Sequence, residues 1–254
     1  MSADEEIRAG SVLPAERRSL ELFTGDGLRL VGEIALPVGA PTAATLVCVH
    51  PLPTHGGMMD SHLLRKASWR LPALARIAVL RFNTRGTTSA AGTSEGEFDE
   101  ARGEGLDLDA AIAVARDLGL PRVWLLGWSF GCDVILKRGP VDGIEGVVLV
   151  SPALRFTTPE ELERWAGAGV PLACLIPEND DYLRPDQARE RFAVVPEAQV
   201  IAGEGAGHLW VGEPYVRMVL DEVAGRLTGA GPLPTSWPAA RAASEGPMER
   251  WSDL

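Results

Sequence analysis

The chain has 254 residues, of which 46% are hydrophobic and 23% charged, and its formal net charge is −11. This length suits one large domain or two small ones, and the composition is that of an ordinary globular protein. Because the charge is strongly negative and no run of Lys or Arg interrupts it, we expect no binding to DNA, RNA or anionic lipid.

The first ten residues, Met1–Gly10, are acidic and lack the apolar segment of a signal peptide. No stretch of the sequence approaches the roughly 18 apolar residues that a membrane span needs. We therefore expect a cytoplasmic protein without a membrane span.

Short β-rich runs then alternate with helical patterns. Strands are predicted over Ser19–Thr24, Leu28–Leu36, Ala44–Val49, Ile77–Phe82, Arg122–Trp128, Gly146–Val150, Pro171–Ile176 and Ala198–Ile201. Helices are predicted over Ser61–Ala75, Asp99–Leu118, Phe130–Lys137, Pro159–Ala166, Pro185–Phe192 and Val211–Leu227. The helix Asp99–Leu118 places Leu106, Ala110, Ala113 and Ala115 near one face.

Strands that are apolar on both faces and separated by helices indicate a mainly parallel sheet with helices on both faces. The first two strands flank Gly25-Asp26-Gly27 and form a hairpin, which makes the sheet mixed. We expect an α/β fold with about eight strands. The segment between Val150 and Leu172 is too short for a large cap domain.

Three parts of the chain are distinguished: an N-terminal arm (1–18), an α/β domain (19–228) and a C-terminal tail (229–254). The tail is rich in Pro, Gly, Ala and Ser and has no apolar period, so we expect it to be mobile or loosely docked. Trp237 and Trp251 are its candidate anchors.

The cysteines Cys48, Cys132 and Cys174 are odd in number and widely spaced, which predicts buried thiols.

The pattern Gly-x-Ser-x-Gly occurs twice, around Ser129 and around Ser94. A nucleophilic serine on such a pattern must end a strand and open a helix, because a strained turn lifts its hydroxyl out of the sheet. Ser129 follows the apolar run Val123–Leu126 and precedes a helical segment, whereas Ser94 lies in a polar loop. We therefore predict Ser129 as a nucleophile. The N–H of Phe130, at the start of the helix, can face a developing oxyanion.

A serine nucleophile needs a base, and His208 is the only histidine after Ser129. In the order Ser, acid, His, the acid falls in the loop after the predicted strand Pro171–Ile176. Asp180 and Asp181 both fit there and Glu178 is an alternative; we favour Asp180. The acid would fix the tautomer of the histidine.

A second oxyanion donor is expected in the loop from His50 to Gly57, after the strand Ala44–Val49. Leu52 is the candidate, because its neighbours Pro51 and Pro53 have no N–H. His50, His55 and His62 fit no zinc spacing, so we expect no metal; His50 is interpreted as a brace for the loop.

These residues together resemble the α/β-hydrolase superfamily, and in particular its cap-less, dienelactone-hydrolase-like bacterial members. The resemblance rests on the elbow at Ser129, on His50-Pro51-Leu52-Pro53 with Gly56-Gly57-Met58-Met59, on Leu80–Gly86 and on Phe98-Asp99-Glu100. It implies a Ser129–Asp180–His208 triad, Leu52 and Phe130 as oxyanion donors, no cofactor, and ester or thioester substrates. The long turn over residues 87–97 and the tail depart from the pattern.

Two other functions use the same residues: a non-catalytic ligand- or partner-binding relative, and acyl transfer or peptide cleavage. Arg85 is interpreted as a salt-bridged structural residue, with substrate carboxylate binding as the alternative. Trp69, Trp128, Trp165, Trp210 and Tyr182 are candidates either for an apolar acyl site or for the core.

Overall fold

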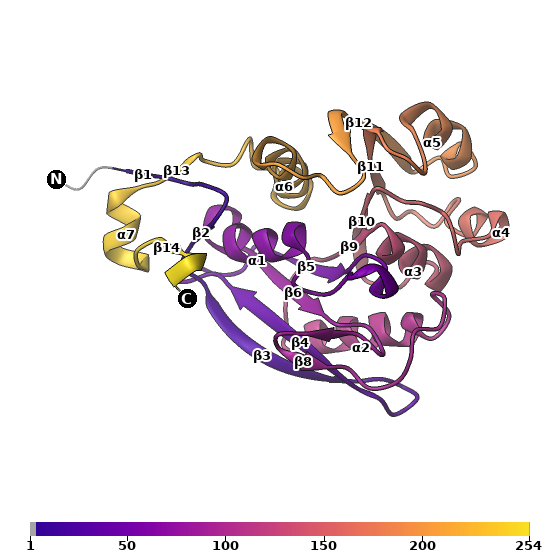
Figure 1. Ribbon diagram of the computed structural model, residues 1–254, viewed down its shortest axis with the longest axis horizontal. Coiled ribbons are helices and arrows are strands. Elements are labelled where there is room, and N and C mark those ends of the chain that lie inside the picture. The colour runs from indigo at the N-terminus through magenta and orange to yellow at the C-terminus, as the bar shows by residue number, and fades with distance from the viewer. Residues whose placement is uncertain (1–3, 254) are drawn as a thin grey trace.

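The computed structural model describes residues 4–253 and is built around an eight-stranded sheet (Figure 1). In spatial order its strands are β12 (Ala198–Gly207), β11 (Leu172–Asn179), β10 (Ile144–Val150), β9 (Val123–Trp128), β5 (Ala44–Val49), β6 (Ile77–Phe82), β4 (Arg29–Leu36) and β3 (Glu16–Phe23). Strand β4 is antiparallel to both its neighbours, and the strands from β6 to β12 pair in parallel. The predicted mixed, mainly parallel sheet is confirmed.

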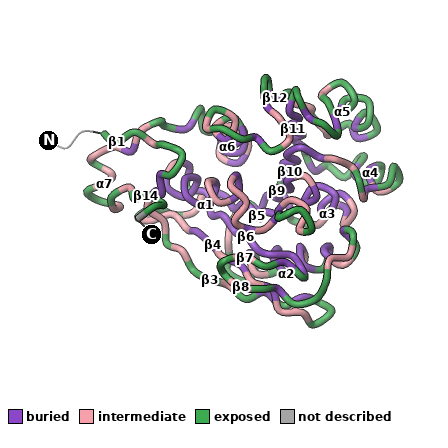
Figure 2. Tube along the Cα trace, in the orientation of Figure 1, coloured by how far each residue is buried: buried purple, intermediate pink, exposed green. Residues whose placement is uncertain are grey.

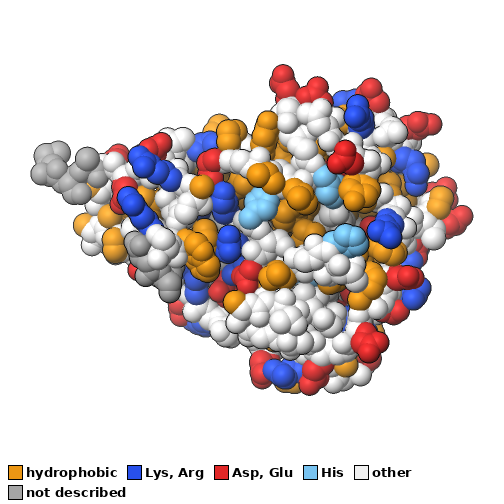
Figure 3. All heavy atoms as spheres, in the orientation of Figure 1, with side chains coloured by type: hydrophobic (Ala, Val, Ile, Leu, Met, Phe, Trp, Pro, Cys, Tyr) orange, Lys and Arg blue, Asp and Glu red, His pale blue; other side chains and the backbone are white. Residues whose placement is uncertain are grey.

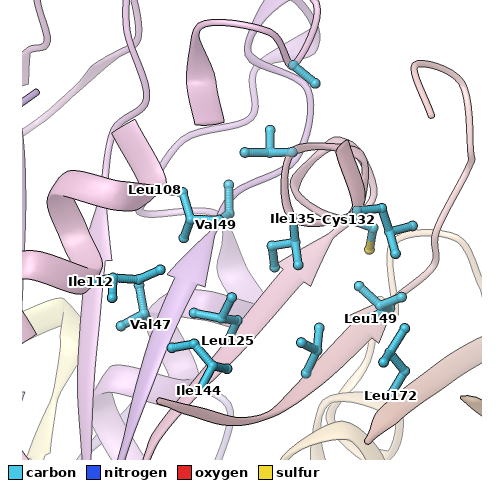
Figure 4. Close-up of a cluster of buried hydrophobic side chains, with 14 of the residues drawn as sticks. Val47, Val49, Leu108, Ile112, Leu125, Cys132, Ile135, Ile144, Leu149 and Leu172 are labelled. Carbon is cyan, nitrogen blue, oxygen red and sulfur yellow. The ribbon is translucent and has the colours of Figure 1, made fainter. Parts of the chain in front are cut away.

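Helices cover both faces of the sheet. One face packs against α1 (His62–Ala75) and α6 (Glu213–Thr228). The other packs against α2 (Glu104–Asp117), α3 (Phe130–Arg138), α4 (Pro159–Glu163) and α5 (Pro185–Phe192). Every residue of β5, β6 and β9 is buried between these layers, as the purple centre of Figure 2 shows. In Figure 4 side chains of β5, β9 and β10 meet those of α2 and α3.

Residues 151–171, between β10 and β11, contain only the five-residue helix α4. This segment is too short to hold a large cap domain, as predicted. The long turn after β6 forms a small hairpin of β7 (Thr88–Ser89) and β8 (Gly92–Thr93).

Helix α2 differs from its prediction in both its start and its buried face. It begins five residues later than expected, because Glu100 and Ala101 have left-handed backbones, with φ of 53° and 66°. Of the four residues predicted on one face, Ala110 and Ala115 are buried, whereas Leu106 and Ala113 are exposed. Leu108, Ala111 and Ile112 are buried in addition. The helix turns Asp107 inward, where it binds Arg85. Arg85 lies on another segment, so the apolar periodicity of the helix gave no sign of this pair.

The arm and the tail pair with each other beside α1 (Figure 1). Strand β1 (Glu5–Glu6) pairs with β13 (Ser236–Trp237), and β2 (Ser11–Val12) pairs with β14 (Glu249–Arg250). The tail also forms α7 (Ala239–Glu245) and the short 3-10 helix η2 (Trp251–Asp253). The sequence predicted a mobile or loosely docked tail and gave no sign of this pairing, because the pairing partner lies far away in the sequence.

The two tail tryptophans anchor this assembly in different ways. Trp237 is buried in a small cluster with Leu13, and its indole N–H donates to the Gly246 carbonyl at 3.1 Å. Trp251 is half exposed and lies against Trp69, with the Arg65 guanidinium over both rings.

Replacing Trp237 by Ala should lower the free energy of unfolding by about 3 kcal/mol, because a fully buried aromatic ring leaves a cavity. Trp251→Ala is the matched control and should cost about 1 kcal/mol or less, since half of that ring is already in water. Urea denaturation of both variants checks this. Equal losses for the two would contradict the packing described.

Candidate active site

Ser129 occupies a strained turn between β9 and α3. Its backbone lies at φ 52° and ψ −111°, a region that few residues other than glycine adopt. A Cβ at Gly127 would lie 2.5 Å from the Gly131 carbonyl oxygen, and a Cβ at Gly131 would lie 2.2 Å from the Val49 carbonyl oxygen. Both flanking positions therefore require glycine, and the turn has the geometry expected of a nucleophile elbow.

His208 and Asp180 are brought together by the pairing of β11 and β12. Asn179 and Gly207 are partners in this parallel pair, so Asp180 and His208 follow at the same edge of the sheet. The Nδ1 atom of His208 lies 2.8 Å from Oδ2 of Asp180, and its Nε2 atom lies 2.9 Å from Oγ of Ser129. These distances join all three side chains in one hydrogen-bonded chain.

The structure separates the three carboxylates that the sequence left open. Asp180 is 2% exposed, and its Oδ1 accepts backbone N–H groups from Tyr182 at 2.8 Å and Leu183 at 3.2 Å. Asp181 is exposed, and Glu178 instead accepts the Gly205 N–H at 2.8 Å. The local turn thus aims Asp180, and neither of the others, at His208.

The loop that carries His208 is held by a buried relay that the sequence analysis did not single out. The Ser151 hydroxyl donates to the His208 carbonyl at 2.9 Å and accepts the indole N–H of Trp210 at 2.8 Å. Trp210 is 1% exposed, and a Cβ at Gly203 would lie 2.4 Å from its ring. Ser151 directly follows the apolar strand β10, which is the signal that could have revealed it.

Leu52 and Phe130, the expected oxyanion donors, line a common pocket with Ser129. Phe130 is the first residue of α3, so its N–H has no acceptor within the helix. Leu52 precedes the short 3-10 helix η1 (Pro53–His55).

His50 braces this loop, as predicted. It is fully buried; its Nδ1–H donates to the Pro51 carbonyl at 2.6 Å, and its Nε2 accepts the Thr84 N–H at 3.1 Å. Burial lowers the pKa of His50 to about 4, so the neutral ring that this geometry requires is the stable form.

The other two histidines of the rejected zinc hypothesis have separate partners. His62 donates from Nε2 to the Leu209 carbonyl at 2.8 Å, and Nδ1 of His55 lies 3.1 Å from the Thr54 hydroxyl. Within residues 4–253, no three His, Cys, Asp or Glu side chains are grouped so that they could hold a metal ion.

Arg85 and Ser94 serve the fold. Arg85 makes buried bonds to Asp107 at 2.8 and 3.0 Å and also pairs with Asp26, which confirms a salt-bridged structural residue. Ser94 is 1% exposed; its hydroxyl donates to the Asn83 carbonyl at 2.8 Å and accepts the Val31 N–H at 3.0 Å. The cysteines are free and buried, as predicted.

A pocket of about 140 Å³ opens at Ser129 and His208. Histidines lie among apolar side chains on the face that Figure 3 shows. Of the aromatic candidates, Tyr182 lines the pocket and packs on His208, with ring centroids 4.6 Å apart. The other four, Trp69, Trp128, Trp165 and Trp210, are buried in the core. The lining residues are Pro51, Leu52, His55, Ser129, Phe130, Asp133, Ala153, Arg155, Phe156, Tyr182, His208 and Leu209.

Solved structures with the same architecture include an α/β serine hydrolase homologue from Coxiella burnetii, with a TM-score of 0.65, 22% identity and coverage of 84% of this chain and 96% of that one. A protein from Xanthomonas campestris, described as an α/β serine hydrolase without lid, matches with a TM-score of 0.63 and 25% identity. The match covers 86% of this chain and 94% of that one. An esterase from Pyrococcus furiosus matches with a TM-score of 0.68 and 18% identity. The match covers 85% of this chain and 92% of that one.

The chain has the α/β-hydrolase fold. The resemblance to cap-less members of this superfamily is confirmed at the level of the fold. No protein-family model matches the sequence, and no curated protein is significantly similar to it. Within residues 4–253, no helix is long and apolar enough to cross a bilayer.

Ser151→Ala should lower the free energy of unfolding by about 2 kcal/mol, because it leaves the Trp210 indole N–H buried without an acceptor. In a double-mutant cycle with Trp210→Phe, the double variant should lose at least about 0.5 kcal/mol less than the two single losses combined. Chemical denaturation of the four proteins measures this coupling. Strictly additive losses would show that the relay does not hold the loop.

Proposed function

We propose that this protein is a serine hydrolase that cleaves carboxylic esters or thioesters through an acyl-enzyme intermediate. The observation that carries the proposal is the hydrogen-bonded chain from Asp180 through His208 to Ser129, with its last bond of 2.9 Å at the edge of a pocket. A serine hydroxyl becomes a competent nucleophile when a neutral imidazole takes its proton. The serine hydrolases and esterases among the structural neighbours support this proposal.

In the first half of the reaction, Oγ of Ser129 attacks the carbonyl carbon and its proton passes to Nε2 of His208. The carbonyl oxygen becomes an oxyanion, which the N–H groups of Leu52 and Phe130 stabilise. The intermediate then collapses: the bond to the leaving alcohol or thiol breaks, and the proton on Nε2 moves to that group. Asp180 keeps Nδ1 protonated and stabilises the imidazolium that forms.

In the second half, water replaces the alcohol or thiol. His208 takes a proton from the water as its oxygen attacks the acyl carbon, and the same two N–H groups receive the second oxyanion. Collapse breaks the bond to Oγ of Ser129, which takes the proton back from Nε2. The products are a carboxylic acid and the regenerated serine.

The open site favours short acyl chains. The pocket holds about 140 Å³, and no domain is inserted over it between β10 and β11. Its lining includes the apolar side chains of Leu52, Phe130, Phe156 and Leu209. A long chain would extend past these residues into water and gain little binding energy.

A fluorophosphonate probe, which forms a covalent adduct with an activated serine, tests the nucleophile. Intact protein should be labelled at Ser129, and Ser129→Ala should be neither labelled nor able to hydrolyse small activated esters. Ser94→Ala is the control and should keep both properties, because Ser94 is buried in a structural turn. Peptide mapping locates the adduct. Labelling at Ser94, or none in the folded wild type, would refute the proposal.

Asp180→Asn and Asp181→Asn form a matched pair that tests the acid. The Asp180 variant should lose up to about 10⁴-fold in kcat, because an amide cannot hold the required tautomer of His208. The Asp181 variant should stay within about twofold of wild type, since its side chain is exposed. Steady-state kinetics gives both values, and circular dichroism verifies folding. The opposite order would move the acid to Asp181.

A further inference from the structure

Arg155 lies on the loop after β10 and takes no part in the steps above. Of the described residues that line the pocket at Ser129, Arg155 alone is a lysine or arginine, and it is exposed. Its guanidinium makes no ion pair and no hydrogen bond with any residue from 4 to 253. The positive charge of this side chain is therefore available to bind an anion at the pocket.

The guanidinium is held over an aromatic ring of the pocket. Its Cζ atom lies 5.4 Å from the ring centroid of Phe156, which is the range of a cation–π contact. Phe156 in turn packs on Phe130, with ring centroids 5.7 Å apart, and Phe130 directly follows Ser129. Both phenylalanines line the pocket. Two ring contacts thus connect the charge of Arg155 to the start of α3.

Buried bonds from α3 fix the loop that carries Arg155. Oδ1 of Asp133 accepts the Phe156 N–H at 3.1 Å, the Thr157 N–H at 3.1 Å and the Thr157 hydroxyl at 2.7 Å. Nζ of Lys137 donates to the Phe156 carbonyl at 3.2 Å. Asp133 is 1% exposed, so it anchors this loop and offers the substrate no competing contact. The backbone at Arg155 is therefore ordered before any ligand binds, which lowers the entropy lost on binding.

We propose that Arg155 is a specificity determinant that binds a carboxylate at the far end of the substrate's acyl chain. This inference rests on the proposed function, and it narrows the substrates to half esters or half thioesters of short dicarboxylic acids. The planar guanidinium matches a carboxylate in two parallel hydrogen bonds. The methylene groups between the two ends would lie against the rings of Phe130 and Phe156, which line the pocket.

The position of His208 indicates the acyl side of the substrate rather than the leaving group. Its Nε2 atom gives its proton to the leaving group, so that group lies against His208 and the Tyr182 ring that packs on it. Arg155 belongs instead, through Phe156, to the side of Phe130. A carboxylate at this exposed arginine can also keep part of its hydration, which limits the cost of binding a charge.

Arg155→Gln tests the inference with two matched pairs of esters. In the first pair, monomethyl glutarate and methyl 5-amino-5-oxopentanoate differ only in a carboxylate or an amide at the end of the acyl chain. In the second pair, butanoyloxyacetate and butanoyloxyacetamide carry the same two groups on the alcohol side. The readout is kcat/KM for each ester at one fixed neutral pH, where the carboxylates are ionised.

The ratio of the glutarate ester to its amide should fall about fivefold from wild type to Arg155→Gln, which is the scale of a solvent-accessible ion pair. The loss should appear mainly in KM, because the contact is the same before and during the chemical step. Intrinsic ester reactivity cancels, since one ratio is compared between two enzymes. An unchanged ratio in a folded variant would overturn the inference. A fall confined to the alcohol-side pair would also overturn it, because Arg155 would then serve the leaving group.

Arg191→Gln is the matched control for net charge. Arg191 is an exposed arginine of α5 that does not line this pocket and makes no ion pair within the described residues. Its loss changes the net charge by the same amount, so the glutarate ratio should stay within about twofold of wild type. A fall equal to that of Arg155→Gln would assign the effect to overall charge and overturn the inference.

Two outcomes separate this inference from the proposed function. If wild type cleaves none of the four esters and the fluorophosphonate probe does not label Ser129, the proposed function itself fails. If Ser129 is labelled but the glutarate ester is not cleaved, or if its ratio to the amide does not depend on Arg155, the role of Arg155 alone is refuted.

Discussion

The site depends on the close approach of α3 to the end of β5. The Gly131 backbone lies so near the Val49 carbonyl that a single added carbon would clash. This approach is possible only because β9 turns into α3 within one residue, and Ser129 accepts a left-handed backbone to make that turn. The first N–H of α3, the Ser129 hydroxyl and the Asp133 carboxyl are all placed by the same junction. Their relative positions are therefore set by main-chain packing rather than by flexible side chains.

The parallel sheet then supplies one polar residue at the end of each of four neighbouring strands. Ser129 follows β9, Ser151 follows β10, Asp180 follows β11 and His208 follows β12. Main-chain bonds continue the alignment past the strands, since the Ser129 N–H donates to the Val150 carbonyl at 2.8 Å and the Ser151 N–H to the Leu175 carbonyl at 2.9 Å. Side chains that are distant in sequence reach one another because parallel strands end at a common edge.

Sequence reasoning succeeded where the signal is local. The central strands, the helices that follow them and the turn at Ser129 are all encoded by apolar runs and by glycines at fixed spacing. Those features predicted the sheet, and they separated Ser129 from Ser94. The choice between Asp180 and Asp181 had no such signal, because the N–H groups of Tyr182 and Leu183 decide which carboxylate turns inward.

The residues that sequence reasoning missed have partners far away in the chain. Ser151 is hydrogen-bonded to Trp210 and to the His208 carbonyl, and the pocket residue Asp133 is hydrogen-bonded to Thr157. An aspartate on a helix usually faces water, so its pattern alone gave no reason to place Asp133 in a pocket wall. The buried face of α2 similarly differs from the predicted one, because Asp107 on this face binds Arg85, which lies on another segment.

The pairing of the arm with the tail makes the chain nearly circular, and this bears on the order of its synthesis. Strands β1 and β2 cannot find their partners until β13 and β14 have left the ribosome, so these strands complete their pairing long after they are made. Until then Leu13 and the surface of α1 near Ala73 lack the cover of Trp237. The nascent protein would pass through a stage in which the central sheet has formed and this edge still exposes apolar surface.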